Sequence, residues 1–129
     1  MNPLRPIALA TALAALCAAG AGAAPSQPSR ARACFRPADA YSWAPVNDRI
    51  VNLKVNLHDV FQLTLLGDCP NIDWSQNIAI RSRGAGWICD PLGAEVIAPG
   101  PVGPRHCAVQ AMRKLTPEEV AALPKGQKP

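Results

Sequence analysis

The chain has 129 residues and a formal net charge of +4, and 49% of its residues are hydrophobic. A chain of this length is sufficient for one domain. The basic residues are scattered and never form a run of five or six, which is typical of an ordinary solvated surface. The charge pattern therefore predicts no nucleic-acid binding.

The first 23 residues have the pattern of a secretory signal peptide. Arg5 precedes an uncharged, Ala- and Leu-rich run over residues 7–19, which is too short to cross about 30 Å of hydrocarbon as a helix. Ala21-Gly22-Ala23 fits a small-x-small cleavage pattern, with the cut before Ala24. We therefore expect an exported protein, periplasmic or secreted, without a transmembrane span. The alternative is a buried helix in a cytosolic fold.

Cys17 raises a second possibility, an outer-membrane lipoprotein anchored through that residue. A lipobox needs a small residue immediately before its cysteine, whereas Leu16 occupies this position. Residues 24–33, which include Pro25 and Pro28, are expected to form a disordered linker. The domain itself is predicted over residues 34–123, and residues 124–129 are predicted to be a flexible tail.

Four cysteines remain after the predicted cleavage: Cys34, Cys69, Cys89 and Cys107. Their even number, their wide spacing and an oxidising compartment together favour two disulfides. A small domain has a thin core margin, which makes such cross-links valuable. The absence of any Cys-x-x-Cys pair argues against a structural zinc site and against a disulfide oxidoreductase. Of the three connectivities open to four cysteines, strand parity favours Cys34–Cys89 with Cys69–Cys107.

Two alternating segments in the first half of the domain predict a β-hairpin. Residues 51–57 place Val51, Leu53, Val55 and Leu57 on one face, and residues 61–65 alternate in the same way, as half-buried strands do. His58-Asp59 lies between them at the expected turn. Residues 40–43 are expected to form a short strand before this hairpin, and residues 67–71 a turn after it.

The second half continues as short strands separated by turns. Strands are predicted over residues 78–83, 94–98 and 106–114, with a reversal at 84–86 into residues 87–89 and a further turn at 90–93. Residues 99–104 carry three prolines and two glycines, which predict a stiff loop, or else an exposed ligand for a proline-binding partner. Thr116, Pro117 and Glu119 predict the capped start of a short helix. The fold class expected is mainly β, a small antiparallel barrel or curled sheet of five to six strands with a short C-terminal helix.

The order of these features resembles a domain-of-unknown-function family of small exported bacterial proteins. The residues that carry the resemblance span about ninety positions and are Cys34, Asn47-Asp48-Arg49, Cys69-Pro70, Arg81-Ser82, Cys89 and Cys107. The resemblance implies an exported, disulfide-bonded domain. It implies no activity, ligand or catalytic residue.

No pattern in the sequence predicts catalysis, a cofactor or a metal centre. His58 is expected in a turn and His106 beside a cysteine, while most aspartates fall in turn clusters, where they cap the backbone. The chain contains no Gly-x-Ser-x-Gly elbow, phosphate loop or dinucleotide fingerprint. The sequence therefore favours a protein that is not an enzyme.

Trp43, Trp87, Arg81 and Arg83 form the candidate binding surface, because aromatic rings and guanidinium groups together can line a groove. The alternative is that the tryptophans fill a small core and cover a disulfide. The function expected is a noncatalytic envelope domain that binds an envelope protein or a cell-wall component. An inhibitor-type module using the Pro99–Pro104 loop and a small hydrolase are the alternatives.

Overall fold

The computed structural model describes residues 33–129 and contains six antiparallel strands. The predicted signal peptide, the Cys17 lipid site and residues 24–32 of the predicted linker lie outside this range. The strands are β1 (Ala40–Asn47), β2 (Ile50–Val55), β3 (Asp59–Leu65), β4 (Ala79–Ser82), β5 (Ala94–Ala98) and β6 (Arg105–Lys114). They form one sheet in the order β1-β2-β3-β6-β5-β4.

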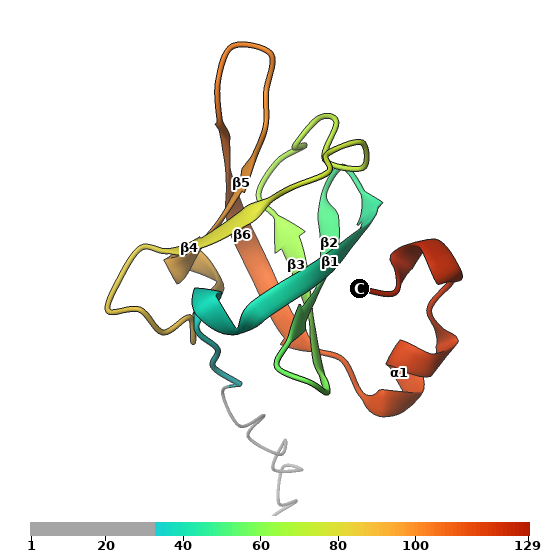
Figure 1. The fold of residues 1–129 in the computed structure, drawn as a ribbon. Coiled ribbons are helices and arrows are strands. Elements are labelled where there is room, and N and C mark those ends of the chain that lie inside the picture. The colour runs from blue at the N-terminus through green and yellow to red at the C-terminus, as the bar shows by residue number, and fades with distance from the viewer. Residues whose placement is uncertain (1–32) are drawn as a thin grey trace, which may run out of the picture.

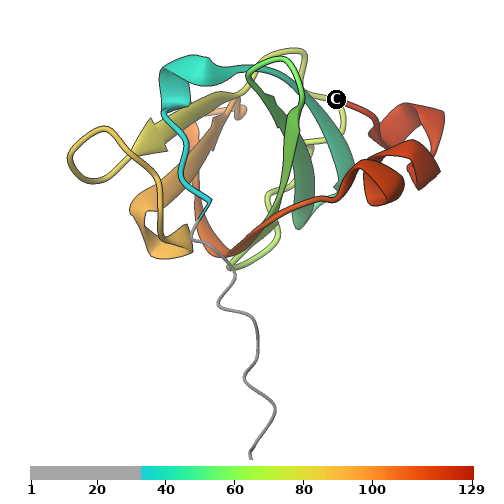
Figure 2. The ribbon, with the colours of Figure 1, turned by 90° about the horizontal axis from the view of Figure 1, so that it is seen from below.

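The sheet consists of two three-stranded meanders that are joined where β3 pairs with β6. Figures 1 and 2 show that it curls, so that the edge strands β1 and β4 approach each other across an open side. Part of the bend comes from a bulge in β6. Thr64 pairs with Ala111 and Leu65 with Val109, so Gln110 is the extra residue, and a bulge bends its strand. The expected mainly β, curled antiparallel sheet is confirmed.

The predicted hairpin forms β2 and β3, and the apolar residues that alternate along these two strands contribute to the core. Val51, Leu53 and Val55 are at most 2% exposed, and Leu53 lies opposite Phe61 in the register. Leu57, expected on the same face, is instead 74% exposed in the turn. The reason is Asn56, whose left-handed φ of 55° ends β2 after Val55 and reverses the chain earlier than predicted.

The second meander closes the core from the other side. Ala94, Val96 and Ala98 of β5 point inward, together with Cys107 and Val109 of β6. Residues 87–89, which follow the reversal at 84–86, contribute an isolated bridge outside the six strands. In that bridge the Phe35 and Ile88 backbones exchange hydrogen bonds of 3.0 and 2.7 Å. Short 3-10 turns precede β1 (Pro37–Asp39) and β5 (Pro91–Gly93).

Disulfides join Cys34 to Cys89 and Cys69 to Cys107, which is the pairing that strand parity favoured. The two bonds have different surroundings. Cys69 and Cys107 are 0% and 8% exposed and belong to the core, whereas Cys34 and Cys89 are exposed. The Cys34–Cys89 bond therefore ties surface segments together, and the Cys69–Cys107 bond passes through the core.

The C-terminal segment covers part of the outer face of the sheet. Helix α1 (Pro117–Ala122) begins with the predicted capping box between Thr116 and Glu119. The residues expected to be a flexible tail contain a 3-10 turn (Lys125–Gln127) that packs near β1. The Asn52 amide, 0% exposed, donates to the Gln127 carbonyl at 2.8 Å and accepts from Gln62 at 3.1 Å.

Candidate binding surface

The loop between β5 and β6, residues 99–104, is the most projecting feature of the structure (Figure 1). Val102 at its tip is 99% exposed. The turn is tight, since a Cβ atom at Gly100 would lie only 2.7 Å from the Gly103 carbonyl oxygen, and Gly103 has a φ of 131°. Glycine is needed at both places, because other residues would clash or be strained. The loop predicted over residues 99–104 is thus the tight turn of a projecting hairpin that connects β5 to β6.

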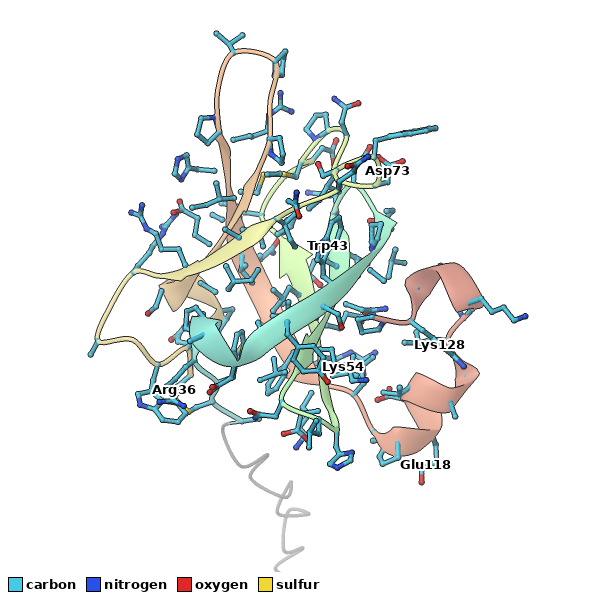
Figure 3. The ribbon with its side chains drawn as sticks, in the orientation of Figure 1. Arg36, Trp43, Lys54, Asp73, Glu118 and Lys128 are labelled. Atoms are coloured by element: carbon cyan, nitrogen blue, oxygen red, sulfur yellow. A yellow bond between two sulfur atoms is a disulfide. The ribbon has the colours of Figure 1, made fainter. Side chains whose placement is uncertain are left out.

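The connection from β3 to β4, residues 66–78, lies beside this hairpin at the same end of the sheet (Figure 1). It is wound into turns in which Ile72 N–H donates to the Cys69 carbonyl and Trp74 N–H donates to that of Asn71, each at 3.2 Å. Ile72 is fully buried, whereas Trp74 is 82% exposed. Asp73, which precedes Trp74 in the sequence, is labelled at the upper right of Figure 3. The indole is therefore held out in solvent by an anchored loop.

Two links hold these loops together at their base. One is the Cys69–Cys107 disulfide, and the other is a 3.5 Å hydrogen bond from Arg105 Nη1 to the Pro70 carbonyl. We call Val102, Trp74 and Leu66, which is 59% exposed, the loop end. At the foot of the hairpin lies a mainly apolar groove of about 440 Å³, between Ile78 on one side and residues 97–100 on the other.

The residues of the candidate surface predicted from the sequence fall in three separate places. Trp43 is half-buried against the core and lines a pocket of about 350 Å³ between β1 and β4 (Figure 3). Trp87 is 56% exposed, with the Arg36 guanidinium 5.3 Å from its ring centroid. Neither tryptophan shares a described pocket with Arg81 or Arg83.

Arg81 and Arg83 do lie together, around a glutamate that the sequence analysis did not single out. The Glu95 side chain is 8% exposed, and Arg83 Nη2 and His106 Nδ1 approach its oxygens at 3.0 and 3.2 Å. Hydrogen bonds from His106 and Arg83 lower the pKa of Glu95 below its ordinary value. We call Arg81, Arg83 and His106 on Glu95 the Glu95 cluster. Only the register of β4 with β5, and of β5 with β6, reveals this cluster, because its members are distant in sequence.

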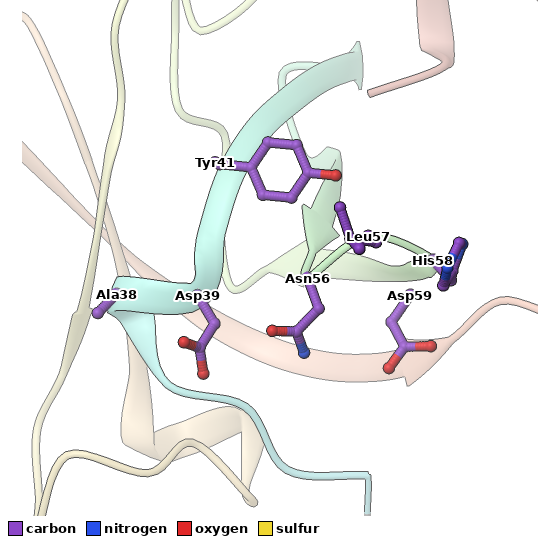
Figure 4. Close-up of a pocket in the computed structure, with 7 residues that line it drawn as sticks. All are labelled: Ala38, Asp39, Tyr41, Asn56, Leu57, His58 and Asp59. Carbon is purple, nitrogen blue, oxygen red and sulfur yellow. The ribbon is translucent and has the colours of Figure 1, made fainter.

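A third cavity, of about 560 Å³, opens at the opposite end beside the β2–β3 turn (Figure 4). Asp39, Asn56 and Asp59 point to one side of it, and His58 also lines it, from the turn. Each carboxylate has a cation nearby, since Arg36 Nε lies 3.0 Å from Asp39 and Lys114 Nζ lies 2.8 Å from Asp59. The aspartates are therefore largely neutralised within the fold.

Of the two histidines in the described chain, His58 lies in the β2–β3 turn and His106 lies in β6. His106 contacts Glu95, and its neighbour Cys107 is in a disulfide. Within residues 33–129, no group of three or more His, Cys, Asp or Glu side chains is arranged to hold a metal ion. Over the same range, no helix is long and apolar enough to cross a membrane.

The fold and the cross-links define a disulfide-bonded antiparallel half-barrel with a rigid loop end. The chain belongs to a family of unknown function, DUF6491, whose model matches residues 3–128. Comparison with curated proteins and comparison with solved structures each found no significant match. The two disulfides fit an extracellular or otherwise oxidising compartment.

Proposed function

We propose that this protein is a noncatalytic binding domain of the cell envelope that recognises a partner protein through its loop end. The observation that carries the proposal is the pair of anchored loops presenting Val102 and Trp74, which are 99% and 82% exposed. Large apolar side chains held out in solvent on two neighbouring loops favour an interaction site. Tryptophan in particular is enriched among the residues that dominate binding energy.

The shape of the loop end favours a protein partner over a cell-wall component. Small ligands bind in concave pockets that cover most of their surface, whereas the hairpin projects into solvent (Figure 1). A projecting apolar tip is complementary to a cleft in another protein. Because the disulfide and the glycine turn already fix the hairpin, little conformational entropy is lost on binding.

The inhibitor-type module is the second candidate, and it uses the same residues. If the cleft that receives Val102 is the active site of an enzyme, occupation would block that enzyme. The projection of the hairpin is compatible with this form, because a stiff loop can enter a cleft without rearranging. The two candidates differ only in the identity of the partner.

The noncatalytic part of the proposal follows from the sequence, which carries no catalytic pattern. Within the described range, no hydrogen bond joins either histidine to a serine or threonine hydroxyl, and all four cysteines there are disulfide-bonded. A hydrolase of the nucleophile-and-base type needs such a contact.

The test is capture of a partner from the envelope fraction of the native host by the wild-type protein and by matched variants. Val102→Asp and Trp74→Ser change the loop end. Leu57→Asp and Trp87→Ser change residues that are 74% and 56% exposed elsewhere. We expect one protein to be retained by the wild type and by both controls, and lost by the loop-end variants.

The purified partner should then bind at least tenfold more weakly to each loop-end variant, which corresponds to about 1.4 kcal/mol or more. Inhibition of an enzymatic partner by the wild type would select the inhibitor form. Equal binding by Val102→Asp, or loss of binding in Leu57→Asp alone, would reject the loop end as the site.

A further inference from the structure

The Glu95 cluster is a place among the described residues where several cations share a single carboxylate. Among the other ion pairs, Arg36–Asp39, Arg49–Asp68 and Lys114–Asp59 each join one cation to one acid. Glu95 instead has Arg81, Arg83 and His106 around it. The cluster therefore carries an excess of at least one positive charge, even with a neutral imidazole.

The register explains how these side chains meet on the outer face of the sheet. Arg81 of β4 is the direct cross-strand partner of Glu95, and Arg83 follows two residues later on the same side. On the other flank Glu95 faces Ala108, and His106 precedes Ala108 by two residues. The small alanine side chain leaves room, so the two guanidinium groups and the imidazole converge above the carboxylate.

The glutamate is covered while the cations remain accessible. Its side chain is 8% exposed, whereas those of Arg81, Arg83 and His106 are 62%, 49% and 48% exposed. A carboxylate is costly to bury unless it is paired and hydrogen-bonded, so Glu95 keeps Arg83 and His106 within hydrogen-bond distance and Arg81 within 3.7 Å. This makes Glu95 a positioning residue and leaves the cations as the contact surface.

Much of the donor capacity of these cations is unused within the fold. Arg81 Nε lies 3.7 Å from the Glu95 carboxylate, which is beyond hydrogen-bond distance. No acceptor in the described part of the chain takes a hydrogen bond from the Arg81 guanidinium. A guanidinium has five N–H donors in a planar fork that matches the oxygens of carboxylate, sulfate and phosphate groups.

We propose that Arg81, Arg83 and His106 form a binding site for an oxyanion, held in place by the buried Glu95 beneath them. The ligand chemistry is a phosphate, sulfate or carboxylate group whose oxygens accept hydrogen bonds from Arg81 and Arg83. The site lies on the outer face of β4, β5 and β6, apart from the loop end, so it does not depend on the proposed protein partner.

The test is a titration of the protein with inorganic phosphate at constant ionic strength, followed by NMR of the arginine Nε–H and histidine signals. We expect saturable shifts confined to Arg81, Arg83 and His106. Arg81→Gln should weaken phosphate binding at least tenfold. Because Arg81 is largely exposed and makes no hydrogen bond within the described chain, this variant should keep its fold.

Arg49→Gln is the matched control, since the Arg49 side chain is 54% exposed and pairs with one acid, Asp68. It should leave phosphate affinity within twofold of the wild type. Sulfate and acetate titrations identify the preferred oxyanion, and saturable binding of either one at Arg81 supports the site. Shifts that rise linearly without saturation for all three anions, or an equal loss of affinity in Arg49→Gln, would overturn the proposal.

Discussion

Replacing both cysteines of one disulfide by alanine separates the entropic contribution of each cross-link from its contribution to the core. The sequence separations are 38 residues for Cys69–Cys107 and 55 for Cys34–Cys89. Loop-closure entropy predicts a loss of about 4 kcal/mol for either pair, because the dependence on loop length is logarithmic. On entropy alone, the two double variants should be almost equally destabilised.

The burial of Cys69 and Cys107 should make the two losses of stability unequal. Cys69 and Cys107 are 0% and 8% exposed, so their truncation also removes two buried atoms from the core. Each buried group of this size contributes about 0.8 kcal/mol, and Cys34 and Cys89 are exposed and lack this contribution. We therefore expect a loss of about 5–6 kcal/mol for Cys69→Ala/Cys107→Ala, against about 4 kcal/mol for Cys34→Ala/Cys89→Ala.

Equilibrium unfolding in urea, followed by tryptophan fluorescence and by circular dichroism, measures both losses. Coincident transitions from the two probes are required for a single free energy of unfolding. At a slope of about 1 kcal/mol/M, the two variants should differ in midpoint by about 1–2 M. If the Cys34/Cys89 variant is equally or more destabilised, the core role assigned to Cys69–Cys107 is wrong.

Three further substitutions test separate parts of the structure. Glu95→Gln should cost about 1 kcal/mol at neutral pH through weaker hydrogen bonds to the cluster. Because the pKa of Glu95 is lowered by folding, its contribution is present above the unfolded pKa and disappears as the pH falls through the folded pKa. Acid titration of stability should therefore be flatter in this variant, and an unchanged acid limb would contradict the geometry. Asn52→Ala leaves the Gln127 carbonyl unpaired, so amide exchange in residues 125–127 should accelerate at a cost of about 1–3 kcal/mol. Thr116→Ala removes the helix cap and should cost about 1 kcal/mol, with faster exchange at the start of α1 and unchanged exchange in β2.

Local chemistry was enough to predict the hairpin and the helix start. The alternation around Leu53 and Leu63 specifies which face is buried, and both residues are at most 2% exposed. Thr116 and Glu119 form the predicted capping box because its hydrogen bonds lie within four residues of one another. These features depend on short-range geometry, which the sequence expresses directly.

Features that depend on contacts between distant strands could not be predicted in this way. Nothing near Glu95 in the sequence indicates that Arg81 and His106 converge on it, because the cluster requires the register of three strands. Asn52 follows the pattern of an exposed strand residue, yet Gln127, 75 positions later, covers it. Leu57 was misplaced because Asn56 tolerates the left-handed conformation more readily than most residues, and alternation alone does not reveal where a strand ends.

The position of the Cys69–Cys107 bond links the stability of the fold to the proposed binding role. The bond joins the 66–78 loop to β6 immediately after the hairpin, so the stiffness of the loop end derives from the core. Reduction of both disulfides would remove about 8 kcal/mol, which is comparable with the whole stability of a typical domain. In a reducing compartment the core and the loop end would therefore be lost together, so the proposed binding role requires an oxidising compartment.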